Sequence, residues 1–173
     1  MKQIPQSYPL YLYDVPNHSE VKPLILESIK SMGTHSIIKE GQQLTNTDWH
    51  LAPKCRRPYF DHLKPVTDAH MQTLMQEANF FEMEFPLAIT GCWFQQYAQN
   101  DYHTWHVHEG SIFANVYYVD LPEGAAKTTF KVSGKEFEVE VMEGQILTFP
   151  TCFIHCSKPN LVGVKTVVSF NYL

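Results

Sequence analysis

The sequence has few positive charges and no long apolar run. Its 173 residues include 13 lysines and arginines against 18 aspartates and glutamates, a formal net charge of −5, and Arg56 and Arg57 are the only arginines. A domain that holds nucleic acid by its phosphates normally carries a basic excess, so this partner is disfavoured. No apolar run approaches the ~20 residues that cross a bilayer, which argues against a membrane protein.

The sequence also lacks an export signal and a disulfide framework. Pro5, Pro9 and Pro16 interrupt the N-terminal region, which has no apolar core of the kind found in signal peptides. The four cysteines show no paired spacing: Cys55, Cys92, Cys152 and Cys156. We therefore expect free thiols and a cytoplasmic location.

The composition is that of a folded globular chain. Hydrophobic residues make up 44% and charged residues 18%, which excludes a disordered chain and a coiled coil. The length suits one domain over residues 1–173. We expect residues 1–86 to form a supporting region of helices and loops, and residues 87–173 to form a β core.

Two helices are predicted in the first half of the chain. Ser19 could cap a helix that runs to Met32 and stops at Gly33, with its apolar residues on one face. A second helix is predicted to open at Thr67 and Asp68, with an apolar stripe formed by Met71, Leu74, Met75 and Ala78. Residues 34–66 show little periodicity and indicate a loop with a short strand.

The second half has the pattern of an all-β structure. Runs rich in aromatic and β-branched residues predict strands at 89–97, 112–119, 128–132, 136–141, 145–149, around His155, and at 164–172. A Ser133-Gly134 turn indicates a hairpin between the third and fourth of these. Short strands with no helix between them favour a sandwich or barrel, with the helices against one sheet face.

Three of the nine histidines lie within six residues, at His103, His106 and His108. Side chains alternate along an extended strand, so His106 and His108 are expected to project from the same face. Two imidazoles with this spacing can bind one metal ion, and His155 is the outstanding candidate for the third ligand. Imidazole suits iron, zinc, copper and nickel, so the ligand type alone does not select the metal.

The histidines, cysteines and arginines also have structural interpretations. Isolated histidines are mostly surface or hydrogen-bonded core residues, which we expect of the remaining five: His18, His35, His50, His62 and His70. Cys152 and Cys156 flank His155 and could indicate zinc, but no second cysteine pair completes a tetrahedral site. Arg56 and Arg57 are interpreted as a solvated surface pair.

The C-terminal half resembles a known family in three motifs that occur in the family's order. The motifs are YHTWHVHEGSIFANVYYVDLP, EGQILTFPTCFIHCSKPN and KTVVSFN. They are similar to those of small 2-oxoglutarate/Fe(II)-dependent oxygenases of bacteria and marine phages, within the prolyl-hydroxylase-like superfamily. The resemblance covers residues 87–173 and implies a double-stranded β-helix, or jelly roll, for that region.

The resemblance implies that His106, His108 and His155 are iron ligands. The wider superfamily usually has a carboxylate where His108 stands, and a neutral imidazole leaves one more positive charge on the metal site. Glu109 is the nearest carboxylate, and on a regular strand it would point away from His106. It could serve as a ligand only if the strand ends or bulges there.

The resemblance also implies a site for the cosubstrate 2-oxoglutarate. Lys165 aligns with the arginine that holds its distal carboxylate in the superfamily, and alternation places Ser169 on the same strand face. Lysine keeps the charge of arginine but offers a single donor point. Tyr97 and Gln95 resemble cosubstrate-contacting residues of the nucleic-acid demethylase branch.

Four further residues are expected to line the pocket. Asn115 and Tyr117 share one face of a strand, Asn171 shares the face of Lys165, and His103 is expected at the rim or behind the ligands. These residues complete the predicted site.

The sequence thus predicts an Fe(II)/2-oxoglutarate-dependent dioxygenase that decarboxylates 2-oxoglutarate and uses O2 to hydroxylate a second substrate. Fold-level analogy suggests a peptidyl or prolyl substrate, with a small molecule as the other possibility. Two alternatives remain open: a cupin-like three-histidine metalloprotein that does not use 2-oxoglutarate, and a non-enzymatic jelly-roll binding module. The oligomeric state is not predicted.

Overall fold

The computed structural model describes residues 10–52, 55–77 and 87–173. Twelve strands and two helices follow one another in these residues. In chain order they are β1 (Tyr11–Asp14), α1 (His18–Ser31), β2 (Ile37–Lys39), β3 (Gln42–Leu44), β4 (Asn46–Thr47), α2 (Tyr59–Glu77), β5 (Ile89–Tyr97), β6 (Tyr102–His106), β7 (Phe113–Asp120), β8 (Thr128–Val132), β9 (Lys135–Glu138), β10 (Gln145–Pro150), β11 (Ile154–Ser157) and β12 (Lys165–Tyr172).

The strands form two six-stranded antiparallel sheets that face each other. The major sheet has the order β1-β10-β7-β12-β5-β4 and the minor sheet the order β2-β3-β6-β11-β8-β9. Consecutive strands often lie in different sheets, as when the chain passes from β10 to β11 and back to β12. This is the predicted double-stranded β-helix, and the prediction of a mainly β fold supported by two helices is confirmed.

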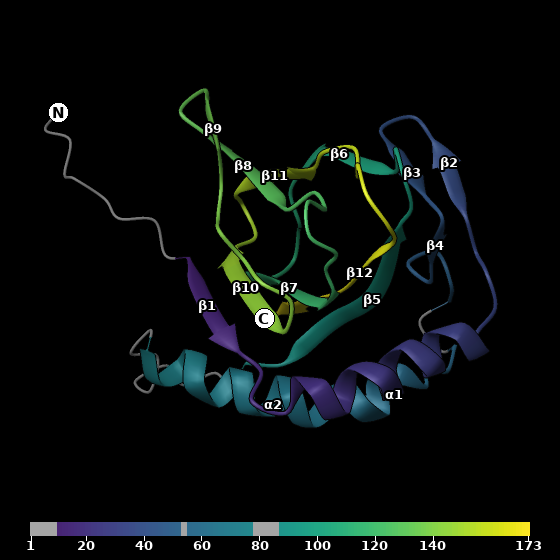
Figure 1. Cartoon of the computed structure of the whole chain (residues 1–173). Helices are drawn as coiled ribbons and strands as arrows, with labels where there is room; N and C mark the ends of the chain where they lie inside the picture. The colour runs from purple at the N-terminus through teal and green to yellow at the C-terminus, as the bar shows by residue number, and fades with distance from the viewer. Residues whose placement is uncertain (1–9, 53–54, 78–86) are drawn as a thin grey trace, which may run out of the picture.

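Both helices cover the outer face of the major sheet. Figure 1 shows α1 and α2 side by side beneath β10, β7, β12 and β5. Ile25 and Ile29 of α1 and Leu63 of α2 are at most 1% exposed and pack against Tyr117, Phe170 and other residues of the sheet. Burial of this outer face leaves the space between the sheets as the cavity of the fold.

A second apolar cluster fills part of the space between the two sheets. Its members include Tyr118, Phe130 and Phe149, each at most 1% exposed. The aromatic side chains come from β7, β8 and β10, so both sheets contribute to it. This cluster closes one part of the interior and leaves the rest open beside β6, β11 and β12.

The first predicted helix is confirmed, although its N-cap is Asn17 and the predicted cap Ser19 lies within the helix, and the second helix begins earlier than predicted. α2 starts at Tyr59 rather than at Thr67, and it contains Pro65 in its interior. Proline removes one backbone hydrogen bond there, which costs stability in a helix. The burial of Tyr59 and Leu63 against the core offsets that cost. Met71, Leu74 and Met75 pack on the core as expected, and Ala78 lies outside the described residues.

Residues 34–66 are more ordered than predicted. In place of a loop with one short strand they contain β2, β3, β4 and the first half of α2. The three strands are two or three residues long and extend the edges of both sheets. Such short segments carry little periodic signal, so the sequence did not predict them. They form strands because β3 pairs with β6 and β4 pairs with β5.

The strands of the second half agree with the prediction in position. β8 and β9 form the expected hairpin around Ser133 and Gly134, both of which have positive φ angles. β9 ends at Glu138, before the predicted end at Val141. β6 and β1 were not predicted as separate strands, and both pair with neighbours distant in the sequence.

Arg57 is part of a buried network and not of a solvated pair. Its Nε donates to Asp48 Oδ2 at 2.7 Å, and Asp48 is fully buried. The same carboxylate accepts hydrogen bonds from the hydroxyl of Tyr59 and the backbone N–H of Phe94, both at 2.8 Å. The network joins the start of α2 to β5. Arg56 does behave as a surface residue, with its side chain 83% exposed beside Asp61.

We expect Asp48→Ala to lower the free energy of unfolding by about 3–5 kcal/mol, because it leaves the Arg57 guanidinium largely buried without its counter-charge. Urea denaturation measures the change. Asp61→Ala is the matched control, since it removes the partner of the exposed Arg56 and should cost less than about 1 kcal/mol. Equal effects of the two substitutions would contradict this account of the network.

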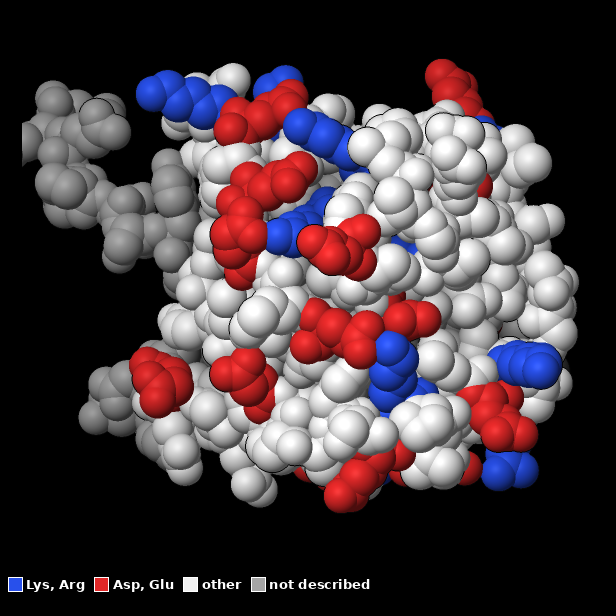
Figure 2. Space-filling model, viewed as in Figure 1, with Lys and Arg blue, Asp and Glu red and all other residues white. Residues whose placement is uncertain are grey.

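The surface in the view of Figure 2 carries acidic and basic side chains interspersed, with carboxylates the more numerous. Several of the lysines are paired, as Lys22 is with Asp120 and Glu143 at 2.8 Å each. In the described part of the chain, neither helix is long and apolar enough to span a membrane.

Candidate metal centre and adjoining pocket

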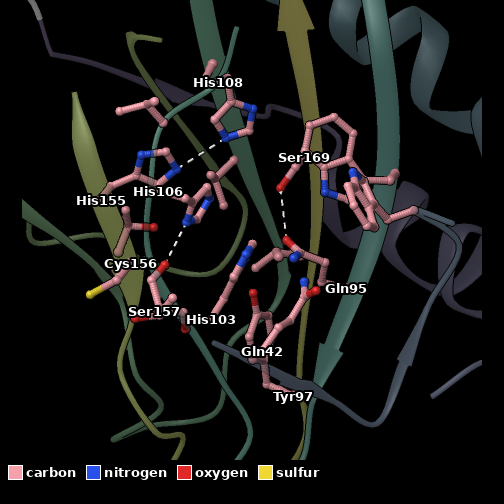
Figure 3. A pocket seen from close by; sticks show the side chains of 18 of the residues that line it. Gln42, Gln95, Tyr97, His103, His106, His108, His155, Cys156, Ser157 and Ser169 are labelled. Atoms are coloured by element: carbon pink, nitrogen blue, oxygen red, sulfur yellow. Dashed lines mark hydrogen bonds between the residues drawn. The ribbon is translucent and has the colours of Figure 1, made fainter. Parts of the chain in front are cut away.

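A cavity of about 430 Å³ opens between the two sheets. In Figure 3, His103, His106, His108 and His155 lie on one side of this pocket, with Gln95 and Ser169 on the strands opposite. Gln42 and Tyr97 lie at its lower end in the same view. The predicted ligands and the predicted cosubstrate residues therefore line one cavity.

Three histidines gather at one place in this pocket. β6 and β11 pair so that His106 lies directly opposite His155, although the two are far apart in the sequence. The candidate ligand atoms of His106, His108 and His155 all lie within 4.8 Å of one another. The Nε2 atoms of His108 and His155 are 3.3 Å apart. The structure thus brings together the residues singled out from spacing and resemblance.

His108 reaches the cluster from beyond the end of a strand. β6 ends at His106, so the expected period-two strand does not continue to residue 108. The backbone N–H of His108 donates instead to the carbonyl of Thr151 at 3.1 Å, which holds the chain close to β11. Glu109 follows as an exposed residue at the rim of the pocket.

Two of the histidines are oriented by backbone carbonyls. Nδ1 of His106 lies 2.8 Å from the carbonyl oxygen of Thr104, and Nδ1 of His155 lies 2.8 Å from that of Phe153. A carbonyl oxygen can only accept, so Nδ1 carries the proton in both rings. The lone pair is left on Nε2, which is the atom that can bind a metal.

All four histidines of the pocket favour the neutral form. Burial, together with a smaller contribution from the neighbouring His106, lowers the pKa of His155 to about 2. Burial is also the main cause for His108, with a pKa of about 4, and for His103, with a pKa of about 3. Neutral imidazoles at pH 7 can accept a cation without first losing a proton.

The donor set fits a divalent first-row transition metal. Imidazole nitrogens bind such ions at about 2.1 Å, so ligands at right angles lie about 3 Å apart, close to the 3.3 Å between His108 and His155. Three neutral nitrogens select for iron, zinc, copper or nickel over magnesium or calcium. The residues present therefore fit the implied Fe(II).

Lys165 is a buried cation in the same pocket. Lys165 is 2% exposed. Its Nζ donates to the carbonyl of Ala126 at 2.7 Å and to Ser157 Oγ at 2.8 Å. The ammonium also lies over the ring of Tyr97, 4.2 Å from its centroid. Burial lowers the pKa of Lys165 to about 7. These partners are neutral, so an anion bound in the pocket would stabilise the buried ammonium of Lys165.

The other predicted cosubstrate residues lie around Lys165. Tyr97 faces it directly across the β5–β12 register and is 3% exposed. Burial raises the pKa of the Tyr97 hydroxyl, so it stays protonated and can donate. Ser169 Oγ donates to Gln95 Oε1 at 3.3 Å. All three side chains belong to residues that line the pocket.

Three of the four residues expected to complete the pocket line it: His103, Asn115 and Asn171. The ring of His103 stacks on that of His106 with centroids 3.9 Å apart. Tyr117 points away toward α1, where its hydroxyl lies 2.8 Å from His18 Nδ1. The side chain of Asn115 is occupied by Phe170 O and Thr148 Oγ1. Asn115 and Tyr117 do share a face, and the side-chain hydrogen bonds of both lie on the helix side, so of the two only Asn115 also lines the pocket.

Several pocket residues were not singled out from the sequence. Ser157 lies two residues after His155, so strand alternation could have found it. Gln42 enters the pocket because β3 pairs with β6, which no sequence pattern indicates. Trp93 stacks on His108 with centroids 5.5 Å apart, and Trp49 lies at the rim.

The cysteines do not join the metal centre. All four, which lie in the described residues, are free thiols, and Cys152 is exposed. Cys156 lines the pocket, but it is not one of the cluster of three histidines. The arrangement therefore favours the three-histidine interpretation over a zinc–thiolate site.

Comparison with solved structures shows that the fold is similar to that of several proteins described as prolyl hydroxylases or alpha-ketoglutarate-dependent enzymes. A Pseudomonas putida prolyl-4-hydroxylase superposes with a TM-score of 0.69 at 14% identity, over 96% of this chain and 92% of that chain. The 2-oxoglutarate complex of a viral collagen prolyl hydroxylase from Paramecium Bursaria Chlorella virus-1 gives 0.67 at 12% identity, over 94% of both chains. SnoN, a non-heme alpha-ketoglutarate-dependent epimerase from nogalamycin biosynthesis, gives 0.69 at 11% identity, over 96% of this chain and 78% of that one.

These likenesses concern the fold. No protein-family model matches the sequence, and no curated protein sequence matches it significantly. The resemblance to the bacterial and phage oxygenases therefore depends on the three motifs themselves.

Proposed function

We propose that this protein is an Fe(II)- and 2-oxoglutarate-dependent oxygenase that hydroxylates its substrate. The observation that carries the proposal is the presence, in one pocket, of three neutral imidazoles and a buried lysine whose partners are neutral oxygens. A metal site next to a buried cation is suited to a ligand that chelates at one end and carries a carboxylate at the other.

The three histidines would hold the iron. His106, His108 and His155 offer one nitrogen each, and three ligands leave further positions for the cosubstrate and O2. Bound Fe(II) supplies the redox chemistry that this reaction needs. The balanced reaction converts 2-oxoglutarate, O2 and a C–H bond of the substrate into succinate, CO2 and the corresponding alcohol.

The chain's own residues would bind and orient the cosubstrate. The Lys165 ammonium would pair with the distal carboxylate, and the protonated hydroxyl of Tyr97, in the same pocket, would donate to it. Ser169 would contribute a donor only by exchanging its hydrogen bond to Gln95 for one to the carboxylate. Gln95 holds Ser169 in place. Because these groups are buried between the sheets, the ion pair forms away from bulk water and is stronger than a surface pair.

We propose a peptidyl substrate, with proline the first residue to test. Support comes from two of the solved structures above, which are described as prolyl hydroxylases and superpose over more than nine-tenths of this chain. The exposed Trp49 and the stacked Trp93 at the pocket offer apolar surface for a ring such as that of proline. Incubation with proline-containing peptides and measurement of a 16 Da mass increase tests this substrate class.

The oxygenase proposal is tested by anaerobic titration of the Fe(II)-loaded protein with 2-oxoglutarate. Chelation should produce a weak visible charge-transfer band with a stoichiometry of one per chain, and exposure to O2 should then release succinate. If iron binds without the band, the cupin-like alternative replaces this proposal. If iron does not bind, the protein is a binding module and the histidine argument fails.

A further inference from the structure

One histidine of the metal cluster lacks the backbone acceptor that orients the other two. His106 and His155 each direct Nδ1 at the carbonyl of the residue two positions earlier. Nδ1 of His108 instead lies 3.2 Å from the side-chain amide of Asn171. The tautomer of His108 therefore depends on which end of this amide faces the ring.

The orientation with the amide nitrogen toward the ring is unsuited to metal binding. The nitrogen of Asn171 would donate to Nδ1, so the single proton of a neutral His108 would sit on Nε2. That atom lies 3.3 Å from Nε2 of His155, at the heart of the cluster, where a free lone pair is needed. In this orientation Asn171 Oδ1 is buried and has no hydrogen-bond partner in the described part of the structure.

We infer that Asn171 is a positioning residue for the metal site, with its amide oxygen accepting a hydrogen bond from Nδ1–H of His108. A half-turn of the planar amide exchanges its two ends and leaves every other atom in place. The oxygen then accepts from Nδ1–H, the amide nitrogen takes the place that the oxygen held, and Nε2 of His108 keeps its lone pair. Each of the three histidines now has the same arrangement, with Nδ1–H on a carbonyl oxygen and Nε2 toward the common site.

The position of Asn171 suits this role. It lies in β12, between Gly91 of β5 and Ala114 of β7, and is 8% exposed. A residue in a central strand, paired on both sides, holds its side chain more firmly than a loop residue would. Partners that orient a metal-bound histidine in this way typically contribute 10–100-fold to metal affinity.

The inference depends on the metal-binding part of the proposed function and not on 2-oxoglutarate. A matched pair of variants tests it: Asn171→Leu has a similar volume and no acceptor, whereas Asn171→Asp keeps an acceptor oxygen. Mn(II) is titrated into each protein, and the free ion is followed by electron paramagnetic resonance. We expect affinity to fall 10–100-fold in Asn171→Leu and to stay within a few-fold of wild type in Asn171→Asp.

A spectroscopic measurement keeps the inference testable if Asn171→Leu does not fold. In the wild-type protein loaded with Zn(II), the imidazole Nδ1–H of His108 should give a slowly exchanging proton resonance close to the Asn171 side chain. Asn171→Asp should retain this resonance. Unchanged Mn(II) affinity in a folded Asn171→Leu, or absence of the resonance in the wild type, overturns the inference. Metal binding without a charge-transfer band would instead overturn the oxygenase proposal and leave Asn171 its role.

Discussion

Replacement of His155 by alanine is expected to abolish stoichiometric metal binding. His155 is buried, faces His106 across β11 and β6, and has its Nε2 3.3 Å from that of His108. Removing one of three ligands should weaken affinity by more than the 10–100-fold that an outer partner contributes. In the wild type, Mn(II) at 100 times its Kd should raise the free energy of unfolding by about 2.7 kcal/mol, and thermal unfolding of His155→Ala should show no such gain.

His50→Ala serves as the control for this experiment. His50 is exposed and contacts His35, away from the cluster, so both metal affinity and the thermal gain should match wild type. A metal-dependent gain of the same size in His155→Ala would show that the ion binds elsewhere. Absence of any gain in the wild type would favour the non-enzymatic binding module.

Lys165→Met is expected to remove measurable 2-oxoglutarate binding while metal binding remains. The substitution keeps the length of the side chain and deletes the cation that pairs with the distal carboxylate. Truncating one partner of a buried charge pair costs about 2–5 kcal/mol, which is about 30-fold to several-thousand-fold in affinity. Anaerobic titration of the Fe(II)-loaded variant should show no charge-transfer band at concentrations that saturate the wild type.

The affinity of the wild type for 2-oxoglutarate should also depend on pH. Burial lowers the pKa of Lys165 to about 7 from its ordinary value of 10.5, and a bound carboxylate would raise it again. Binding is therefore accompanied by proton uptake above pH 7. We expect full affinity below pH 7 and a loss of up to about tenfold per pH unit above it.

Lys158→Ala is the matched control for Lys165. Lys158 lies near the end of β11 with its side chain 48% exposed, and it pairs with Glu136 on the surface. Its replacement should leave both the affinity for 2-oxoglutarate and its pH dependence unchanged. If Lys165→Met retains the band, the carboxylate is held by another group and the assignment of Lys165 is wrong.

Much of the β half was predictable because its local patterns agree with its tertiary environment. In residues 136–141 glutamates alternate with apolar residues, and the Ser133-Gly134 turn precedes them. Both features predict a hairpin at the edge of a sheet, where one face is exposed to solvent and the other is buried. His155 could be proposed as the third ligand because it lies between two predicted strands of the same β region. The role of Lys165 stays a prediction, which depended on its alignment with the arginine of the superfamily and not on a local pattern.

When both faces of a strand are buried, the alternation of its residues does not indicate which face lines the pocket and which packs against the helices. In β7 nearly every residue is buried, because helices cover one face and the minor sheet the other. Asn115 and Tyr117 were correctly placed on one face, yet the hydrogen bonds of both side chains lead toward α1 and α2, and Tyr117 does not line the pocket. The sequence pattern of such a strand does not indicate whether a helix or a second sheet covers a given face.

The sequence by itself determined which residue types are available for chemistry and where they stand along the chain. They are an HxH pair, a later histidine and a lysine on the last predicted strand, in a half of the chain whose pattern is that of β-strands. Only the tertiary structure decided how these meet. The register of β6 with β11 opposes His106 and His155, and the backbone bond to Thr151 brings His108 back to them. β12 carries Asn171 to His108. Contacts of this kind depend on strand order and register, which are set by packing of the whole core and leave no local trace in the sequence.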